Sequence, residues 1–275
     1  QEYLLEPVVL NMSDTLFRMA GERQDERMQA VAIATQLDYY YFQGTNEDSV
    51  IHYTNKVKEF AKATHQPKYY YFAWANRLIT YYLKTSRTNI ALYEVQNMLK
   101  EAQEEDDKTG LSRCYNIMSQ IYTIKRFDSM AFEWRLKEIE LTEKYKIENY
   151  NISQTYAQIA NYYINQKKQK EALAAVEKAI ATANSSTQQI SAKLEFVNYY
   201  SKFGDFQAAE KLLKECQAAF EQDKRLESIK KRLYNIECLY YQQTKQYQKA
   251  LEAAKMQEKE ERRLSESILS SIHYR

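Results

Sequence analysis

The chain of 275 residues carries 39 lysines and arginines against 37 aspartates and glutamates, a formal net charge of +2. Nucleic-acid-binding proteins usually show a large or clustered basic excess, so this balance argues against direct binding of DNA or RNA. Hydrophobic residues make up 44% of the chain, which is enough to build a core and argues against disorder. Because strand-rich folds need frequent turn residues, the low counts of 4 glycines and 2 prolines favour an all-α fold.

A pair of large apolar or aromatic residues recurs along the chain, and its second member is a tyrosine in six successive segments. These tyrosines are Tyr40, Tyr82, Tyr122, Tyr163, Tyr200 and Tyr241. Their spacing of about 40 residues is the mark of a solenoid, in which each unit buries its apolar face only against its neighbours. We therefore predict a single domain over residues 1–275 with no internal boundary.

Residues 1–21 hold the first helical pattern, which ends at Gly21. Its apolar positions are Val8, Val9, Met12, Leu16 and Met19. They recur at helical spacing, and this helix has no second helix with which to form a hairpin. We expect this stretch to form a capping helix that covers the open end of the array.

Six helical hairpins are predicted over residues 27–262. In the clearest segment, residues 153–183, apolar residues at helical spacing lie on both sides of a polar break at residues 165–168. They are Tyr156, Ile159, Ala160 and Tyr163 before the break, and Ala172, Val176 and Ala179 after it. Two amphipathic helices joined by a short turn form an αα-hairpin, and the alanines let the helices approach closely. Gly44 and Gly204 mark two further turns, where glycine accepts a conformation that other residues resist.

The C-terminal residues predict an extended helix over residues 263–275. Residues 257–263 are densely charged, and Leu264, Ile268 and Ile272 then continue an apolar stripe past the last repeat. A stripe with no repeat left to cover needs another partner. We expect either a second copy of the chain, forming a homodimer, or a downstream stalk that leads to a membrane span and a signalling domain.

The hairpins resemble tetratricopeptide repeats. That family's unit carries an aromatic residue near the start of its first helix and a tyrosine near its end, then alanines around an aromatic position on the second helix. The matching residues are Tyr156, Ile159, Ala160, Tyr163, Ala172, Val176 and Ala179, and then Phe196, Val197, Tyr200, Gly204, Asp205, Phe206, Ala209 and Leu213. The match is strong over residues 150–260 and weaker over 27–146. The resemblance implies a right-handed superhelical solenoid of about six hairpins, whose first helices line a concave groove.

The resemblance places a set of polar and aromatic residues in that groove. They are Asn76, Thr80, Tyr115, Ser119, Tyr122, Asn161, Asn198, Lys202, Tyr234 and Tyr241, with Asp38, Tyr41, Ser112, Gln154, Ser191 and Lys231 on the same helices. Amides both donate and accept hydrogen bonds, so they can pair with the backbone of an extended peptide, and tyrosine adds rigid contact area with a polar tip. We predict a groove that binds a peptide or a protein segment. The alternative is that the tyrosines only pack between repeats.

No residue pattern indicates catalysis, a metal site or a cofactor, so we expect a segment that is not an enzyme. The three histidines are far apart, and no cysteine stands at ligand spacing to them. The scattered Cys114, Cys216 and Cys238 suit buried apolar positions better than disulfides. We expect every glycine in a turn, which leaves no phosphate-binding loop. No apolar run of about 18 residues occurs, so no membrane span is predicted in this segment.

At this repeat length, the whole chain resembles the helical-repeat input domains of bacterial signalling proteins. These include the sensory regions of two-component histidine kinases and the peptide-binding halves of quorum-sensing regulators. We expect a peptide-binding sensory region of the histidine-kinase kind, on the periplasmic side of a membrane-anchored sensor, where a ligand shifts the array between curvatures. The alternatives are the peptide-binding half of a quorum-sensing-type transcriptional regulator, or a free-standing scaffold or adaptor, in the cytoplasm.

Overall fold

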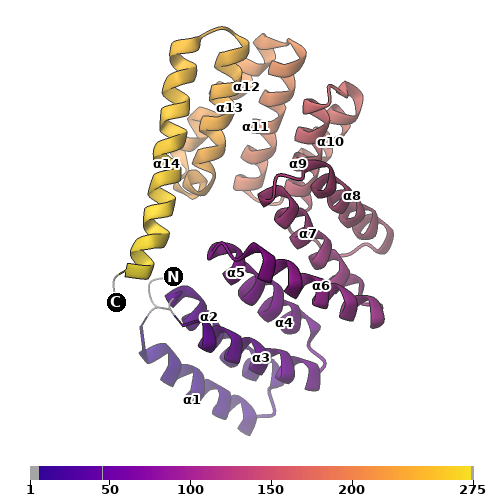
Figure 1. The fold of residues 1–275 in the computed structure, drawn as a ribbon, viewed down its shortest axis with the longest axis vertical. Coiled ribbons are helices and arrows are strands. Elements are labelled where there is room, and N and C mark those ends of the chain that lie inside the picture. Colours follow the sequence, from indigo (N-terminus) through magenta and orange to yellow (C-terminus); the bar gives the residue numbers. More distant parts are fainter. Residues whose placement is uncertain (1–5, 45, 274–275) are drawn as a thin grey trace. The chain divides into compact units, whose positions relative to one another are not determined.

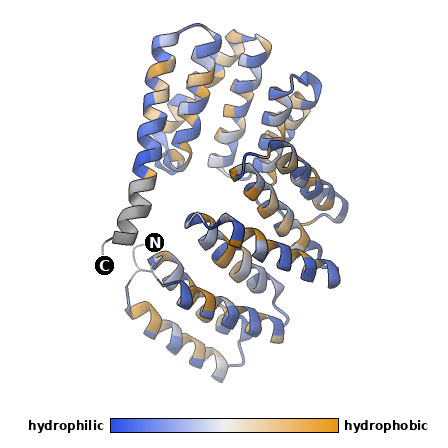
Figure 2. Ribbon diagram, viewed as in Figure 1, coloured by the Kyte–Doolittle hydropathy of each residue, from blue (hydrophilic) through white to orange (hydrophobic). Residues whose placement is uncertain are grey.

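Every regular element is a helix in residues 6–44 and 46–273, the part of the chain that the computed structural model describes (Figure 1). Side chains are described as far as Leu264. Each helix mixes hydrophobic and hydrophilic residues along its length, as the amphipathic patterns predicted (Figure 2). The all-α prediction is thus confirmed. None of the helices within these residues is both long and apolar enough to cross a membrane.

The chain forms two compact units, residues 1–134 with 270–275, and residues 135–269. We call them unit 1 and unit 2. The helices of unit 1 are α1 (Val8–Glu22), α2 (Glu26–Gln43), α3 (Glu47–Ala63), α4 (Pro67–Tyr71), the π-helical η2 (Phe72–Ile79), α5 (Thr80–Lys84), α6 (Thr88–Glu104), α7 (Lys108–Ile124) and the start of α8 (Asp128–Tyr145). Because α4, η2 and α5 follow one another without a break, they serve as one first helix, which pairs with α6.

Unit 2 begins within α8 and continues through three further helix pairs. Its helices are α9 (Ile152–Asn165), α10 (Gln169–Ala181), α11 (Ser186–Phe203), α12 (Phe206–Gln222), the 3₁₀-helical η3 (Lys224–Ile229), α13 (Lys230–Gln243) and α14 (Tyr247–His273) as far as Leu269. The described elements therefore run in the predicted order, α1 followed by six helix pairs. The prediction that they unfold as one continuous domain stays a prediction.

Small residues bring the paired helices together, as predicted. Ala160 on α9 and both Ala172 and Ala179 on α10 are fully buried. The first helices also lie against one another, since α11 packs against both α9 and α13. This stacking of first helices side by side is what brings residues of successive repeats into one surface.

Most helices end on a residue in the left-handed region of the backbone. Gly44 (φ 69°) and Gly204 (φ 89°) supply it at two predicted turns. Elsewhere ordinary residues adopt it, namely Gln24, His65, Ser86, Asp106, Arg126, Lys146, Lys167 and Lys245. A residue other than glycine in this conformation costs roughly 1–2 kcal/mol, so these turns are locally strained. The chain thus forms its turns with few glycines, because other residues adopt the left-handed conformation instead.

The glycine prediction is wrong at two positions. Gly21 lies in the last turn of α1 and Gly110 in the first turn of α7, not in turns between helices. An alanine Cβ at Gly110 would stand 2.4 Å from Cζ and Oη of Tyr71. Glycine is therefore needed there for the close approach of the α4 ring to α7, a requirement that no local pattern reveals.

The two ends of the array differ in part from prediction. In α1 the predicted apolar face is confirmed only in part, because Val9 and Leu16 are half-buried but Val8, Met12 and Met19 are exposed. Ser13 and Ala20 are buried instead. Helix α1 packs against α2, and small side chains allow that close contact. At the other end, α14 runs unbroken to His273, so the predicted exit helix over 263–275 continues the last hairpin. Leu264 is exposed. The side chains of Ile268 and Ile272 lie outside the described residues.

Candidate functional site

All ten predicted groove residues lie on first helices. Asn76 and Lys202 are exposed, Ser119 and Asn198 are buried, and the others are half-buried, namely Thr80, Tyr115, Tyr122, Asn161, Tyr234 and Tyr241. We call the side of the first helices that carries them the first-helix face. Whether these residues bind a ligand stays a prediction, and their surroundings indicate how each one is used.

In unit 2 a buried carboxylate joins three first helices. Glu195 on α11 is only 1% exposed. Its Oε1 accepts hydrogen bonds from Nδ2 of Asn161 on α9 (3.2 Å) and Nδ2 of Asn198 (2.8 Å). Its Oε2 pairs with the Arg232 guanidinium on α13 at 2.5 Å. The two amides predicted to pair with a peptide backbone therefore donate to a carboxylate of the protein itself, and we call these four residues the Glu195 cluster.

A small pocket adjoins this cluster, one helical turn closer to the N-terminal ends of α9 and α11. It measures about 100 Å³ and is lined by Ser153, Gln154, Ala157, Thr187, Gln188, Ser191, Ala192 and Ile229. Two of these side chains brace the walls. Ser153 Oγ donates to the Ala179 carbonyl (2.7 Å), and Gln188 Nε2 donates to the Tyr150 carbonyl (2.6 Å). We call this cavity the α9–α11 pocket.

Three side chains of the α9–α11 pocket remain available to a ligand. Gln154, Thr187 and Ser191 make no side-chain hydrogen bond to another described residue. Together they offer an amide and two hydroxyls, which can donate and accept. Gln154 and Ser191 were predicted groove residues, whereas Thr187 was missed, although it lies four residues before Ser191 on the same face of α11.

In unit 1 the first-helix face carries a similar internal pairing. Arg77 Nε lies 2.5 Å from Oδ1 of Asp38, and the guanidinium lies 4.3 Å from the centre of the Phe72 ring. The predicted Asn76 accepts a hydrogen bond from Arg113 at 2.7 Å. Polar groups of successive first helices thus satisfy one another, as they do around Glu195.

The remaining predicted residues have mostly local contacts. Thr80 Oγ1 donates to the Ala75 carbonyl, and Ser119 Oγ donates to the Asn116 carbonyl. The rings of three tyrosines meet other side chains: Tyr115 lies against Trp134, Tyr122 against Phe127, and Tyr241 below the Lys249 ammonium. Burial raises the pKa of Tyr234. These three ring contacts join residues of the same hairpin, so the alternative interpretation, that the tyrosines only pack between repeats, stays a prediction.

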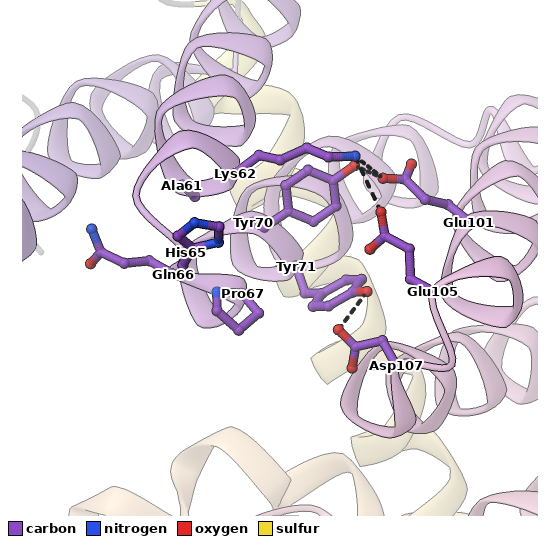
Figure 3. Close-up of a pocket in the computed structure, with 10 residues that line it drawn as sticks. All are labelled: Ala61, Lys62, His65, Gln66, Pro67, Tyr70, Tyr71, Glu101, Glu105 and Asp107. Carbon is purple, nitrogen blue, oxygen red and sulfur yellow. Dashed lines mark hydrogen bonds and ion pairs between the residues drawn. The ribbon is translucent and has the colours of Figure 1, made fainter.

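A larger pocket of about 380 Å³ lies in unit 1, where the ends of α3 and α6 meet the starts of α4 and α7 (Figure 3). Its lining residues are Ala61, Lys62, His65, Gln66, Pro67, Tyr70, Tyr71, Glu101, Glu105 and Asp107. We call it the tyrosine–carboxylate pocket. Sequence reasoning missed it, because its residues come from the ends of the second helices α3 and α6, the turns that follow them and the start of a first helix at α4, none of which was a predicted groove position.

Hydrogen bonds organise the wall of this pocket. The Tyr70 hydroxyl donates to Glu101 (2.5 Å), and the Tyr71 hydroxyl donates to Asp107 (3.0 Å). The pKa of Tyr70 is raised first by burial and then by its hydrogen bond to Glu101. The pKa of Tyr71 is raised first by burial and then by the negative charge of Asp107. Both hydroxyls therefore keep their protons and stay donors to the carboxylates.

The described residues contain no group of three or more His, Cys, Asp or Glu side chains that could hold a metal. Cys114 and Cys216 are buried, and burial raises the pKa of each thiol to about 12. A thiol that keeps its proton is a poor nucleophile, so these two side chains act as small core residues.

Comparison with known proteins identifies the fold. No protein-family model matches the sequence, and no curated protein matches it either. Among solved structures, the apo form of RapI aligns with TM-score 0.62 and 11% identity, over 94% of this chain and 99% of RapI. BtubC (BKLC) from P. vanneervenii gives TM-score 0.57 and 16% identity, over 80% of this chain and 93% of BtubC.

A Rap protein complexed with competence and sporulation factor gives TM-score 0.53 and 17% identity, over 92% of this chain and 75% of that protein. At such identities the likeness concerns the fold alone. These neighbours are helical-repeat proteins, and the all-helical arrangement found here is consistent with a fold of that type. The chain therefore has an all-α, solenoid-type fold of tetratricopeptide-like helical hairpins.

Proposed function

We propose that the chain is a non-catalytic module that binds an extended peptide or protein segment on its first-helix face, at the α9–α11 pocket. The observation that carries the proposal is the set of three available polar side chains, Gln154, Thr187 and Ser191, in a cavity between adjacent first helices. An extended peptide exposes a backbone N–H and C=O at each residue, and these groups need such partners when they are buried.

The Glu195 cluster supports the same location. Ala157 lies four residues before Asn161, and Ser191 lies four residues before Glu195, so the pocket and the cluster adjoin along both helices. A buried carboxylate is weak evidence for stability, because apolar residues of similar size often stabilise a fold as well or better. A buried carboxylate at this face instead supports a binding site, because its hydrogen bonds fix the positions of the polar side chains before a ligand binds.

We further propose that the module is the sensory region of a bacterial signal-transduction protein, on the periplasmic side of a membrane-anchored sensor. The support is the fold shared with RapI and with the Rap protein complexed with competence and sporulation factor. A ligand that draws Asn161 away from Glu195 would change how α9 packs against α11. A preference for one packing shifts the population of the array, which is the thermodynamic basis of a switch.

The binding site is tested with peptides selected from a random display library on the whole 275-residue chain. Ser191→Trp fills the pocket from its rim, whereas Gln189→Trp places the same ring at an exposed position on α11 outside the pocket. We expect the first variant to weaken a selected peptide by about tenfold or more, because the peptide loses partners for buried polar groups. Equal affinity for the two variants would refute the location.

The sensory role needs a separate test, which is the remainder of the open reading frame. A membrane span followed by a kinase domain supports the sensor. A DNA-binding domain before this segment would instead favour a peptide-responsive regulator, and neither would favour a scaffold. The two tests are independent, because peptide binding at the α9–α11 pocket is compatible with all three gene contexts.

A further inference from the structure

The tyrosine–carboxylate pocket in unit 1 has the size and walls of a ligand site. Its volume of about 380 Å³ falls within the range of roughly 300–1,000 Å³ that small-molecule sites occupy. Tyr70 and Tyr71 form one wall, with ring centres 5.3 Å apart and planes nearly perpendicular, and Pro67 stands beside them (Figure 3). These rings offer an apolar surface to an aliphatic chain and a negative π face to a cation.

Charge distinguishes this pocket from an ordinary surface hollow. Three carboxylates line it, Glu101, Glu105 and Asp107, against the ammonium of Lys62. The Tyr70 and Tyr71 hydroxyls point their protons at Glu101 and Asp107, so their oxygens remain as acceptors. An entering ligand therefore meets acceptors and π faces, and an anion or a purely apolar molecule would meet repulsion or unsatisfied charge.

Lys62 shows where a cation is held. Its side chain is 63% exposed, yet its Nζ lies 3.3 Å from Glu101 and 3.2 Å from Glu105. The hydrogen bonds to Glu105 and then to Glu101 raise the pKa of this ammonium. An exposed lysine loses little when it swings back into water, because a solvated ion pair of this kind contributes little to stability. The same two carboxylates can thus accept a competing cation.

We propose that the tyrosine–carboxylate pocket binds the basic side chain of a peptide or protein partner, with arginine preferred. The aliphatic stem would lie along Tyr70, Tyr71 and Pro67. The guanidinium would replace the Lys62 ammonium between Glu101 and Glu105, where its planar fork matches paired carboxylate oxygens. The pocket is a second site, in unit 1, and it does not depend on the proposed binding at the α9–α11 pocket.

The test compares two blocked tripeptides by calorimetry at low salt on the whole chain. They are acetyl-Ala-Arg-Ala-amide and its citrulline counterpart, in which a neutral urea group replaces the guanidinium. We expect the arginine peptide to bind about tenfold tighter, because hydrogen bonds to a charged group are the stronger kind. Equal affinities would overturn the proposal.

Four variants locate the binding. Glu101→Gln keeps an oxygen to accept from Tyr70 but removes the charge, and Glu105→Gln removes the charge at the more exposed partner of Lys62. Each should weaken binding of the arginine peptide several-fold. The control Glu104→Gln changes net charge equally on the same helix, outside the pocket, and should leave affinity unchanged. Lys62→Met removes the resident competitor and should tighten binding. A loss of affinity in Lys62→Met, or equal losses in Glu104→Gln and Glu105→Gln, would refute the site.

Two further measurements separate the sources of the signal. Ser191→Trp, which fills the α9–α11 pocket, should leave affinity for the arginine peptide unchanged; a loss there would assign the binding to unit 2 and overturn the proposal. Agmatine carries the guanidinium and stem without a peptide backbone, and we expect it to bind more weakly than the tripeptide. Tighter binding of agmatine would assign the pocket to a free amine instead of a peptide side chain.

Discussion

Replacing Gly110 by alanine should destabilise unit 1, although the same change stabilises most helices. At an open helix position, Gly→Ala gains about 1 kcal/mol. Here the new Cβ would stand 2.4 Å from Cζ and Oη of Tyr71 and 2.8 Å from its Cε1. The Tyr71 ring is only 2% exposed and lines the tyrosine–carboxylate pocket, so moving it aside would disturb both its packing and that pocket.

The change in unfolding free energy caused by Gly110→Ala is the sum of opposing contributions. Overpacking a buried site costs about 1–3 kcal/mol, and displacing the ring also breaks the hydrogen bond from Tyr71 to Asp107, worth about 1 kcal/mol. Set against the gain in helix propensity, we expect a net loss of about 1–3 kcal/mol. Urea unfolding followed by tryptophan fluorescence measures it, because the two tryptophans, Trp74 and Trp134, both belong to unit 1.

A matched control exists at the other helical glycine. A Cβ at Gly21 would meet only Nε2 of Gln29 closely, at 2.9 Å, and that atom ends a flexible side chain. Gly21→Ala should therefore be neutral or slightly stabilising. If Gly110→Ala is as stable as Gly21→Ala, the close contact between α7 and the Tyr71 ring does not exist, and the geometry of the tyrosine–carboxylate pocket would need revision.

Three further outcomes follow from the local structure. Lys167 holds a φ of 56°, so Lys167→Gly should raise stability by about 0.5–1 kcal/mol in thermal unfolding, whereas Lys170→Gly, inside α10, should lower it by a similar amount. Alkylation read by mass spectrometry should modify Cys114 and Cys216 only after unfolding, since burial raises both thiol pKa values to about 12. Burial raises the pKa of Glu237, against the hydrogen bond from Gln217, so this carboxyl favours the fold when protonated and that contribution is lost as pH rises through its folded pKa. Glu237→Gln should therefore gain stability at pH 7 relative to wild type, and the gain should vanish in acid; a pH-independent difference would contradict this linkage.

The sequence predicted the helix pairs because their cause is local. Apolar residues at helical spacing must be buried on one face, and alanines such as Ala172 decide how closely two helices meet. The turn at Gly204 was predictable for the same reason, since its left-handed backbone is a property of that residue. Where an element is specified by its own pattern, prediction and structure agree.

The parts that prediction missed depend on residues in other repeats. Glu195 was unremarkable as one charge on a first helix, and its donors Asn161 and Arg232 lie 34 and 37 residues away in the chain. One signal was present, because separations close to the repeat period place complementary groups on neighbouring first helices. The same signal applies to Asp38 and Arg77, which are 39 residues apart. The tyrosine–carboxylate pocket carried a similar signal, since Lys62 lies 39 and 43 residues before Glu101 and Glu105, and Tyr71 lies 36 residues before Asp107. It was missed because none of these residues is at a predicted groove position.

The two units should nonetheless unfold together, and this can be decided with the tryptophans. Helix α8 runs without a break from Asp128 to Tyr145 and so contributes residues to both units. No glycine or proline falls in the stretch from residue 111 to residue 203, so the chain has no flexible linker there. In helical arrays each repeat depends on its neighbours, which couples their unfolding. Tryptophan fluorescence reports Trp74, inside unit 1, and Trp134, at its last residue, whereas circular dichroism at helical wavelengths reports the whole chain. We expect coincident urea transitions by the two probes.

Gly110→Ala, which strains unit 1 only, should then shift both transitions equally. A shift confined to the fluorescence transition would show that the units unfold independently.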